Sequence, residues 1–322
     1  MRPLSRRTVL GSIAGGLPGL LASSPARAWP TRPVRIVVPF PPGGGADLLS
    51  RMLAPHLQKA LGQPFFIENR AGAAGRIGTG IVAKSDPDGH TLLVTTESSI
   101  VIAPHTGVDM AYNPLVDLDP VSLLTRNTVL LVVHPSLPAR DLEEFMALAR
   151  AKPGEMSYGS SGVGGPNHLA GELFKSMTGL NIVHIPFSGT GAALQGVIAN
   201  QVGAMWGFMA GLIPHVRAGT LRAIASGGRE RAAALPDVPT FAEAGLPGYE
   251  AVSWIGMFVP HGTNGAVVDG LAGAVKNAMQ EQDVSDALAR DGSEAAITGP
   301  SGFRRIIASD DAKYAKLAHL FR

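Results

Sequence analysis

Pro39-Phe40-Pro41-Pro42-Gly43-Gly44-Gly45-Ala46-Asp47 lies between an apolar run, residues 34–38, and a segment with helical periodicity, residues 48–61. The run is rich in β-branched residues and predicts a buried strand. Apolar residues of the second segment recur on one helical face until Gly62, a helix C-cap. The glycines let backbone N–H groups point inward, and Asp47 suits the first helical turn. The stretch therefore predicts a strand, a glycine loop and a helix start, an arrangement that can bind a small anion.

This loop lacks the motif of a nucleotide-binding loop. A Walker loop ends in Gly-Lys-Ser/Thr, and a dinucleotide loop has the spacing G-x-G-x-x-G. Here the three glycines are contiguous and the next lysine is Lys59. A tight strand-to-helix turn without a ligand fits the composition as well as a small-anion site does.

The N-terminus has the three parts of an export signal. An arginine-containing start is followed by an apolar stretch, residues 8–21, and then by Ala26-Arg27-Ala28, a cleavage site between small residues. We therefore expect residues 1–28 to be removed on export. Arg6 and Arg7 resemble a twin-arginine signal, and an ordinary secretory signal fits equally, so the export route stays open.

Composition limits the partners of the remaining chain. Without residues 1–28 it has 27 − 4 = 23 basic against 25 acidic residues, a formal charge of −2. Such a balance gives no electrostatic footprint for nucleic acid. The chain has no cysteine, which excludes disulfides, thiolate catalysis and a lipid-modified N-terminal cysteine. We expect a soluble periplasmic monomer, not lipid-anchored, of about two domains.

Short apolar runs alternate with helical patterns along the chain, as is typical of α/β layers over mainly parallel sheets. A second glycine loop, Gly159-Ser160-Ser161-Gly162-Val163-Gly164-Gly165, precedes Pro166, which suits the first position of a helix. One such loop in each half predicts two α/β lobes that face a shared cleft. The predicted strands are 65–67, 91–95, 121–124, 129–133, 182–186, 204–206, 221–225 and 251–259, and the predicted helices are 75–84, 141–151, 192–199, 212–218, 267–279 and 303–320.

Ordered motifs give the chain a family resemblance. They include Arg35-Ile36-Val37-Val38-Pro39-Phe40-Pro41-Pro42-Gly43-Gly44, Glu68-Asn69-Arg70-Ala71-Gly72-Ala73-Ala74-Gly75, Asp86-Pro87-Asp88-Gly89-His90-Thr91-Leu92-Leu93 and His168-Leu169-Ala170-Gly171-Glu172-Leu173-Phe174. On these motifs the chain resembles the tripartite tricarboxylate transporter receptors, also called Bug receptors. The resemblance implies a type II periplasmic-binding-protein fold, with two α/β lobes joined by crossover strands around a ligand cleft. Lobe 1 would be residues 29–128 and 253–322, and lobe 2 residues 129–252.

The resemblance also implies that the two glycine loops clamp a small carboxylate, which the receptor delivers to the membrane subunits of a transporter. Two helix N-termini that face one cleft can hold an anion without an arginine. For His168 a capping role fits equally well. The residues implied at the walls are Phe40, Pro42, Gly43, Gly44, Gly45, Ala46 and Asp47 in the first lobe, and Ser160, Ser161, Gly162, Asn167 and His168 in the second.

The far side of the implied pocket departs from the family pattern. Ser188 follows Phe187 where a basic residue is usual, and Gly207 and Phe208 follow Trp206 where an acidic residue is usual. With Thr190, these residues predict a less charged and more aromatic pocket, which favours a monocarboxylate or aromatic carboxylate over citrate. Core positions for the Trp206 and Phe208 rings fit equally, because aromatic residues in strands are usually buried.

Glu97, followed by Ser98, adds a carboxylate at the mouth of the first lobe. Family members usually have small or hydroxyl residues there. Glu97 is either a solvated loop acid or a partner for an amine or hydroxyl of the ligand.

Other functions have weaker support. The nine histidines include no pair with i, i+4 spacing and no H-E-x-x-H, so we expect no metal, and no motif indicates a cofactor. Gly159-Ser160-Ser161-Gly162-Val163 resembles the nucleophile elbow of a serine hydrolase, but its last position is valine. We expect a binding protein and not an enzyme. A receptor that presents its closed form to a sensor kinase would have the same fold and cleft, so this alternative stays open.

Overall fold

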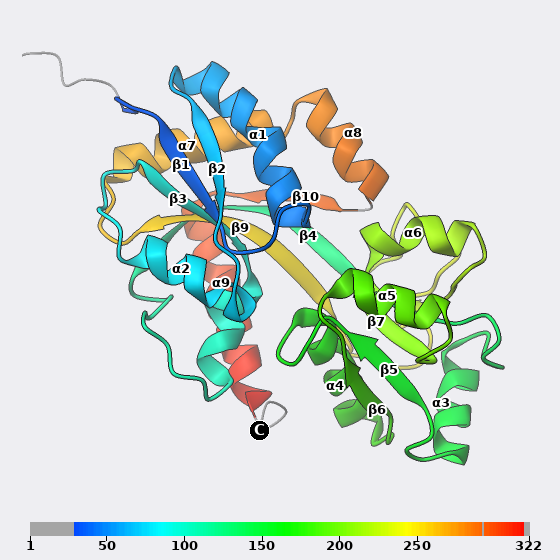
Figure 1. The fold of residues 1–322 in the computed structure, drawn as a ribbon. Coiled ribbons are helices and arrows are strands. Elements are labelled where there is room, and N and C mark those ends of the chain that lie inside the picture. Colours follow the sequence, from blue (N-terminus) through cyan, green and yellow to red (C-terminus); the bar gives the residue numbers. More distant parts are fainter. Residues whose placement is uncertain (1–28, 292, 319–322) are drawn as a thin grey trace, which may run out of the picture.

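The computed structural model describes residues 29–291 and 293–318, so the predicted export signal, residues 1–28, lies outside the described part of the chain. Two α/β lobes lie side by side and share one ten-stranded sheet (Figure 1). The predicted two-lobed α/β fold is therefore confirmed.

Each lobe has its own strands and helices, and two long strands pass between them. The long strands are β4 (Leu118–Val133) and β9 (Val252–Pro260). The first lobe contains β1 (Val34–Val38), β2 (Phe65–Asn69), β3 (Thr91–Thr96), β10 (Glu294–Thr298), α1 (Gly45–Leu61), α2 (Arg76–Ala83), α7 (Gly265–Ala278), α8 (Gln282–Asp291), α9 (Pro300–Lys316) and the short turns η1 (Ala73–Gly75), η2 (Ser98–Ile102) and η3 (Ala103–His105). The second contains β5 (Ser157–Ser160), β6 (Val183–Pro186), β7 (Ala204–Phe208), β8 (Arg222–Ser226), α3 (Leu142–Ala151), α4 (Pro166–Thr178), α5 (Thr190–Ile198) and α6 (Met209–Arg217).

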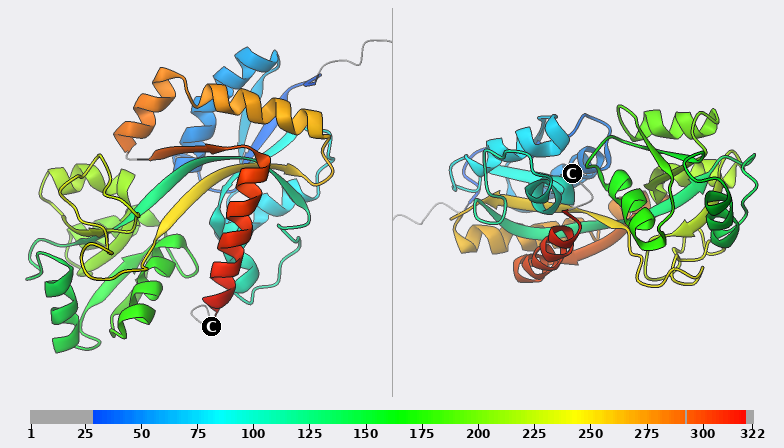
Figure 2. Two further views of the ribbon diagram at one scale, coloured as in Figure 1. Left: turned by 180° about the vertical axis from the view of Figure 1, so that it is seen from behind. Right: turned by 90° about the horizontal axis from the view of Figure 1, so that it is seen from below.

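The strand order is β2-β1-β3-β9-β4-β7-β5-β6, and β8 and β10 also pair with β4. The partners of β4 change within the strand: Thr128 pairs with Val252 of β9, whereas Val129 pairs with Phe208 of β7. We place the lobe boundary at this point. The C-terminal helix α9 lies beside the crossover strands (Figure 2) and contacts β4 and η2.

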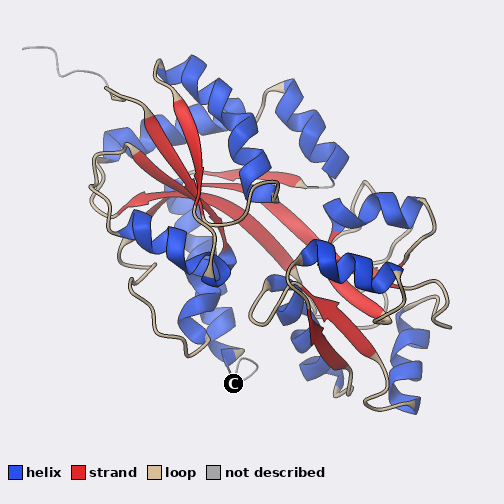
Figure 3. Ribbon diagram, viewed as in Figure 1, coloured by secondary structure: helices blue, strands red, loops and turns tan. Residues whose placement is uncertain are grey.

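Three segments differ from the sequence-based expectation. The runs 121–124 and 129–133 were expected as separate strands but belong to the single strand β4. The polar residues between them, Thr125, Arg126 and Asn127, interrupt the apolar pattern, yet their backbone pairing with β9 continues. The helix α8 and the strand β10, which pairs with β4, were not predicted (Figure 3). The helix has an amphipathic pattern, with Val284 and Leu288 buried, that the sequence-based prediction missed, and the strand has only five residues.

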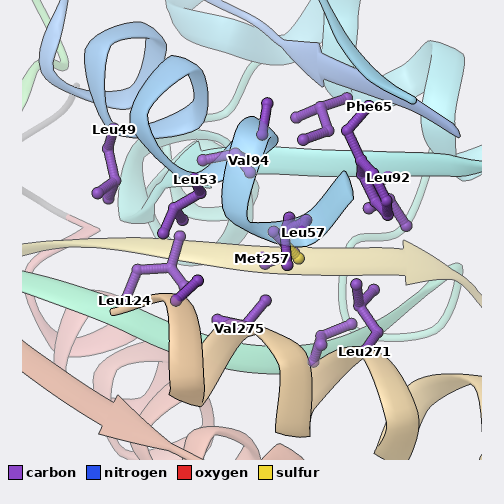
Figure 4. Close-up of a cluster of buried hydrophobic side chains, with 14 of the residues drawn as sticks. Leu49, Leu53, Leu57, Phe65, Leu92, Val94, Leu124, Met257, Leu271 and Val275 are labelled. Carbon is purple, nitrogen blue, oxygen red and sulfur yellow. The ribbon is translucent and has the colours of Figure 1, made fainter. Parts of the chain in front are cut away.

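The first lobe is held by an apolar cluster between its helices and the sheet (Figure 4). Leu53 and Leu57 of α1 and Leu271 of α7 are fully buried and meet Val94 of β3 and Met257 of β9 there. Burying such side chains stabilises the fold by about 1.5–3 kcal/mol each. Leu49, Leu53 and Leu57 of the predicted helical face thus pack on the sheet, whereas Leu48, expected on the same face, is exposed.

The parallel strands of both lobes end near the lobe boundary. In the first lobe β1 pairs in parallel with β3, whose last residue, Thr96, pairs with Ile255 of β9. In the second lobe β5 pairs in parallel with β7, whose last residue, Phe208, pairs with Val129 of β4. The loops that follow β1 and β5, which are the two glycine loops, therefore begin at the ends of the sheets that converge on the crossover strands.

Candidate ligand-binding site

The first glycine loop is shaped by a buried carboxylate. Asp47 is 1% exposed and accepts hydrogen bonds from Gly43 N at 2.9 Å, Asn69 Nδ2 at 2.9 Å and the Arg51 guanidinium. Burial opposes its ionisation, but these hydrogen bonds outweigh burial and lower the pKa of Asp47 to about 2. The carboxylate accepts its hydrogen bonds from the loop and from Asn69, so Asp47 holds the loop in place. It does not accept from the amides of Gly44 and Gly45 at the helix start.

The helix α1 begins directly after this loop. Gly44 is its N-cap, in an extended conformation, and has no side chain that could cap the first amides. Pro42, Gly43, Gly44 and Gly45 are exposed, whereas Ala46 is buried. The first amides of an α-helix have no intrahelical acceptor and carry the positive end of its dipole. The exposed backbone at Gly44 and Gly45 is therefore suited to receive an anion.

A third loop, which the sequence analysis did not assign to the site, supports the first. Asn69 Nδ2 also donates to Phe40 O at 3.1 Å. The Phe40 ring lies 3.2 Å from the place that a Cβ on Gly75 would take, and Ala73 and Ala74 have φ values of 50° and 54°. Left-handed conformations at consecutive non-glycine residues cost energy and cluster at functional sites. The segment 69–75 carries one of the motifs quoted above, but its composition gave no signal for this role.

In the second glycine loop, the hydroxyl of the first serine, Ser160, is turned inward. Ser160 is fully buried, its Oγ lies 2.6 Å from His184 Nε2, and it accepts a hydrogen bond from Gly162 N at 3.1 Å. Ser161, in contrast, is partly exposed, and its Oγ donates weakly to Asn167 Oδ1 at 3.4 Å. Of the two predicted serines, Ser161 is therefore the one with a hydroxyl near the surface of the loop.

The start of helix α4 is fixed by two buried polar side chains. Asn167 Nδ2 donates to Trp206 O at 2.7 Å. His168 Nδ1 accepts a hydrogen bond from Gly164 N at 3.2 Å, so its ring fixes the loop directly before the helix, although the N-cap residue, Gly165, has no side-chain cap. Burial lowers the pKa of His168 to about 4. His184, which sequence reasoning passed over as an isolated histidine, lies against it with 4.2 Å between ring centroids.

The three aromatic residues expected on the far side of the pocket differ in burial. The Trp206 ring is fully buried in the core of the second lobe, in edge contact with Tyr158 at 5.1 Å between centroids, so the core alternative holds. Phe187 is partly buried and packs under Gly159 and Gly196. Phe208 is partly buried, Gly207 is buried and Thr190 is exposed at the start of α5.

Glu97 is not the solvated acid that one alternative expected, because it is only 1% exposed. Its Oε2 accepts hydrogen bonds from Ser253 Oγ at 2.7 Å and Trp254 N at 3.0 Å, both in β9, and its Oε1 has no partner among residues 29–291 and 293–318. Burial raises the pKa of Glu97 to about 7. Ser98 beside it is also buried.

A small cavity adjoins Glu97 where the two lobes meet. Its volume, about 30 Å³, is enough for one or two water molecules. Leu169 of α4 and Tyr314 of α9 line the cavity and share an apolar cluster, so the lobes pack on each other at this point. A second contact joins α6 to α8. Glu97 therefore lies at a contact between the two lobes.

The geometry does not favour a serine nucleophile. Ser160 and His184 are close, but the Ser160 hydroxyl is fully buried and bonded within its own loop, so a substrate carbonyl cannot reach it. In the described part of the chain, no group of three or more His, Asp or Glu side chains could hold a metal ion. No helix among these residues is long and apolar enough to cross a membrane.

Comparisons with known proteins agree with this architecture. A family model described as tripartite tricarboxylate transporter family receptor matches residues 49–319. Protein BugT of Bordetella pertussis is 37% identical over 298 residues, which cover 92% of this chain and 91% of BugT. The structure of R. palustris Rpa4515 with adipate has a TM-score of 0.83 and 34% identity, and covers 91% of this chain and 98% of Rpa4515.

A further solved structure, MatC (Rpa3494) from Rhodopseudomonas palustris with bound malate, has a TM-score of 0.80 and 33% identity. It covers 90% of this chain and 100% of MatC. The family model spans both lobes, and these structures match nearly all of the described residues. The chain therefore belongs to the tripartite tricarboxylate transporter receptor family and is one of its solute-binding receptors.

Proposed function

We propose that this receptor captures a small carboxylate in the periplasm and delivers it to the membrane subunits of a tripartite transporter. The observation that carries the proposal is the pair of glycine loops at the converging ends of the two sheets, each of which opens a helix N-terminus. Residues 40–47 and 160–168 contain no lysine or arginine. Binding would therefore rest on backbone N–H groups and the helix dipoles, with Ser161 adding a hydroxyl.

Within this class, we propose that monocarboxylates or aromatic carboxylates are preferred over citrate. Ser188 and Gly207 leave the far side of the pocket without the charged side chains that a tricarboxylate needs for its additional carboxylates. Phe208 and Phe187 remain partly exposed and offer apolar contacts, whereas the Trp206 ring does not. The adipate and malate in the related structures make dicarboxylates the necessary competitors in any test.

Closure of one lobe on the other would complete the site. The ligand would lie between the two loops, and rotation about the crossover strands would bring the loops together around it. A closed receptor differs in shape from an empty one, so the membrane subunits can distinguish the two. We expect such a rotation to repack the lobe contacts at Leu169 and between α6 and α8.

A ligand screen tests the proposal. The chain from residue 29 onward is unfolded and refolded to remove any bound compound, and its melting temperature is measured with acetate, benzoate, malate, adipate and citrate. A ligand well above its Kd should stabilise the protein by about 3–4 kcal/mol, which raises the melting temperature clearly. Absence of a shift with every carboxylate would contradict the carboxylate site, and a tight response to citrate would contradict the proposed preference. Uptake measured in cells with and without the membrane subunits tests delivery separately.

A further inference from the structure

Two histidines lie in contact beneath the second glycine loop. His168 belongs to the first turn of α4 and His184 to β6, and their rings are 4.2 Å apart and tilted by 41°. His168 is 6% exposed, and His184 is partly buried against the Tyr158 ring at 5.0 Å. The pair therefore connects strand β6 to the first turn of helix α4, which directly follows the second glycine loop.

Each ring has a hydrogen-bond partner in the loop. His168 Nδ1 accepts from the Gly164 N–H at 3.2 Å, so this nitrogen carries no proton and Nε2 does. His184 Nε2 lies 2.6 Å from Ser160 Oγ, whose hydrogen has Gly162 O, at 3.2 Å, as its other acceptor. The shorter distance makes His184 the better acceptor. The two ends of the loop, Ser160 and Gly164, are thus each fixed by a neutral imidazole.

Few charged groups face the pair. Glu172 Oε1 lies 3.9 Å from His168 Nε2, but the same oxygen accepts from Tyr158 OH at 2.8 Å and from Lys175 Nζ at 2.8 Å. This carboxylate is therefore already neutralised by Lys175. Burial lowers the pKa of both histidines, and for His168 the neighbouring His184 ring lowers the pKa further.

A proton on His168 would disturb the loop directly. Nδ1 would then be a donor that faces the Gly164 N–H, so two donors would meet and the hydrogen bond would be lost. A proton on His184 would turn Nε2 into a donor, so the Ser160 hydroxyl would have to turn to the more distant Gly162 O. The structure of the loop is consequently linked to the neutral state of both rings.

We propose that His168 and His184 are positioning residues for the second carboxylate-binding loop, which keeps its binding geometry only while both rings are neutral, so that acidification weakens ligand binding. This inference rests on the proposed function, because it assigns the two histidines to the same site. A protonated histidine beside an anion would attract it, so the opposite sign of pH dependence is a distinct outcome.

Calorimetric titration with benzoate, adipate and malate tests the proposal. Kd is measured from about pH 7 to about pH 4 for the wild type, His168→Gln, His184→Gln and His168→Leu. The ligand's own titration is common to all variants and cancels in their ratio. Glutamine can accept the loop hydrogen bond but does not titrate, so the ratio of wild-type to His168→Gln Kd should rise about twofold by about pH 4, because the pKa of His168 is about 4 and half of its rings are then protonated. His168→Leu should bind more weakly at every pH.

The exposed His261, at the far end of β9, supplies the matched control. His261→Gln should retain the wild-type profile. If the wild type and His168→Gln change in parallel, or if the wild type binds more tightly in acid, the positioning role is wrong although carboxylate binding stands. Failure of all carboxylates to bind at neutral pH would overturn the proposed function instead.

A second measurement decides the inference without a ligand. Spectra of uniformly ¹⁵N-labelled protein report which ring nitrogen carries the proton and also show the backbone amides. We expect a deprotonated Nδ1 in His168 at neutral pH, and a Gly164 amide resonance that shifts in acid with the midpoint of His168. A protonated Nδ1 at neutral pH, or a Gly164 resonance that ignores the titration, would overturn the proposal.

Discussion

The Asp47 carboxylate accepts a hydrogen bond from the Gly43 N–H at 2.9 Å, which ties the first glycine loop to the helix that follows it. Gly43 has a φ of 86°, a left-handed conformation that glycine adopts without strain. Asn69 joins the same carboxylate to the Phe40 carbonyl. The loop is therefore held in one conformation before a ligand arrives, which reduces the entropy lost on binding.

Removing this carboxylate should weaken binding. In Asp47→Ala the Gly43 and Asn69 donors lose their acceptor, and we expect the Kd for the best carboxylate of the screen to rise about tenfold. Asp47→Asn keeps one acceptor oxygen and should lose less. Both are measured by calorimetry with the melting temperature as a check on folding. Unaltered affinity in a folded Asp47→Ala protein would show that the loop needs no such support.

A bulky residue at the helix start should abolish binding. A Cβ on Gly44 meets only Pro41 O, at 3.6 Å, so Gly44→Leu is compatible with the fold but covers the exposed amides. Gly273→Leu on the exposed side of α7, where a Cβ meets nothing within 4 Å, is the matched control. We expect both variants to melt within a few degrees of the wild type and only Gly44→Leu to lose the ligand-induced shift. Binding that survives in Gly44→Leu would remove the first loop from the site.

The two serines of the second loop should respond differently. Ser161→Ala removes a partly exposed hydroxyl and should weaken carboxylate binding by about 1 kcal/mol, about fivefold in Kd, with little change in stability. Ser160→Ala removes the buried hydroxyl that the partly buried Gly162 N–H uses as its acceptor, and should lower the melting temperature as well as the affinity. Thermal unfolding and calorimetry of both variants check this. Equal stability of the two would contradict the inward role of Ser160.

Glu97 should make the protein less stable at higher pH. Its pKa is raised in the folded state from 4.5 to about 7, so the folded protein binds more protons than the unfolded chain between these values. The stabilising contribution of the protonated Glu97 is then present in full below about pH 4.5 and is lost as the pH rises through about 7. Glu97→Gln should be more stable than the wild type above pH 7 by up to about 3 kcal/mol.

Urea unfolding over this pH range measures the difference. Glu155→Gln, which changes an exposed carboxyl on the surface of the second lobe, is the control and should follow the wild type. A wild-type stability that does not fall relative to Glu97→Gln between about pH 5 and 8 would show that the buried carboxyl is compensated by a group that neutralises its charge.

The fold could be predicted well from the sequence because local signals agree with it. The run 34–38, the glycines that follow and the apolar face of residues 48–61 each indicate their observed element, and the family motifs order the elements into two lobes. The crossover strand β4 was predicted only in part. Its middle residues, Thr125, Arg126 and Asn127, are paired by tertiary structure and not by any local preference.

The site was predictable at the level of loops and not of side chains. Whether a polar side chain faces a ligand or supports the backbone depends on partners far away in the sequence. Ser160 is held by His184, Asp47 by Asn69 and Glu97 by Ser253, and none of these partners could be located from spacing. The same is true of Trp206, because its place in the core depends on the rings of Tyr158 and Phe174 around it.

The single strand β4 has a consequence for how the protein can be divided. Residues before Val129 complete the sheet of one lobe, and residues from Val129 onward complete the sheet of the other. A protease cut or a permuted terminus near Thr128 would therefore leave each half of β4 paired within its own lobe, with β9 still intact as the other crossover strand. Such a division should spare the strand pairing of both lobes and should mainly loosen the orientation of one lobe relative to the other.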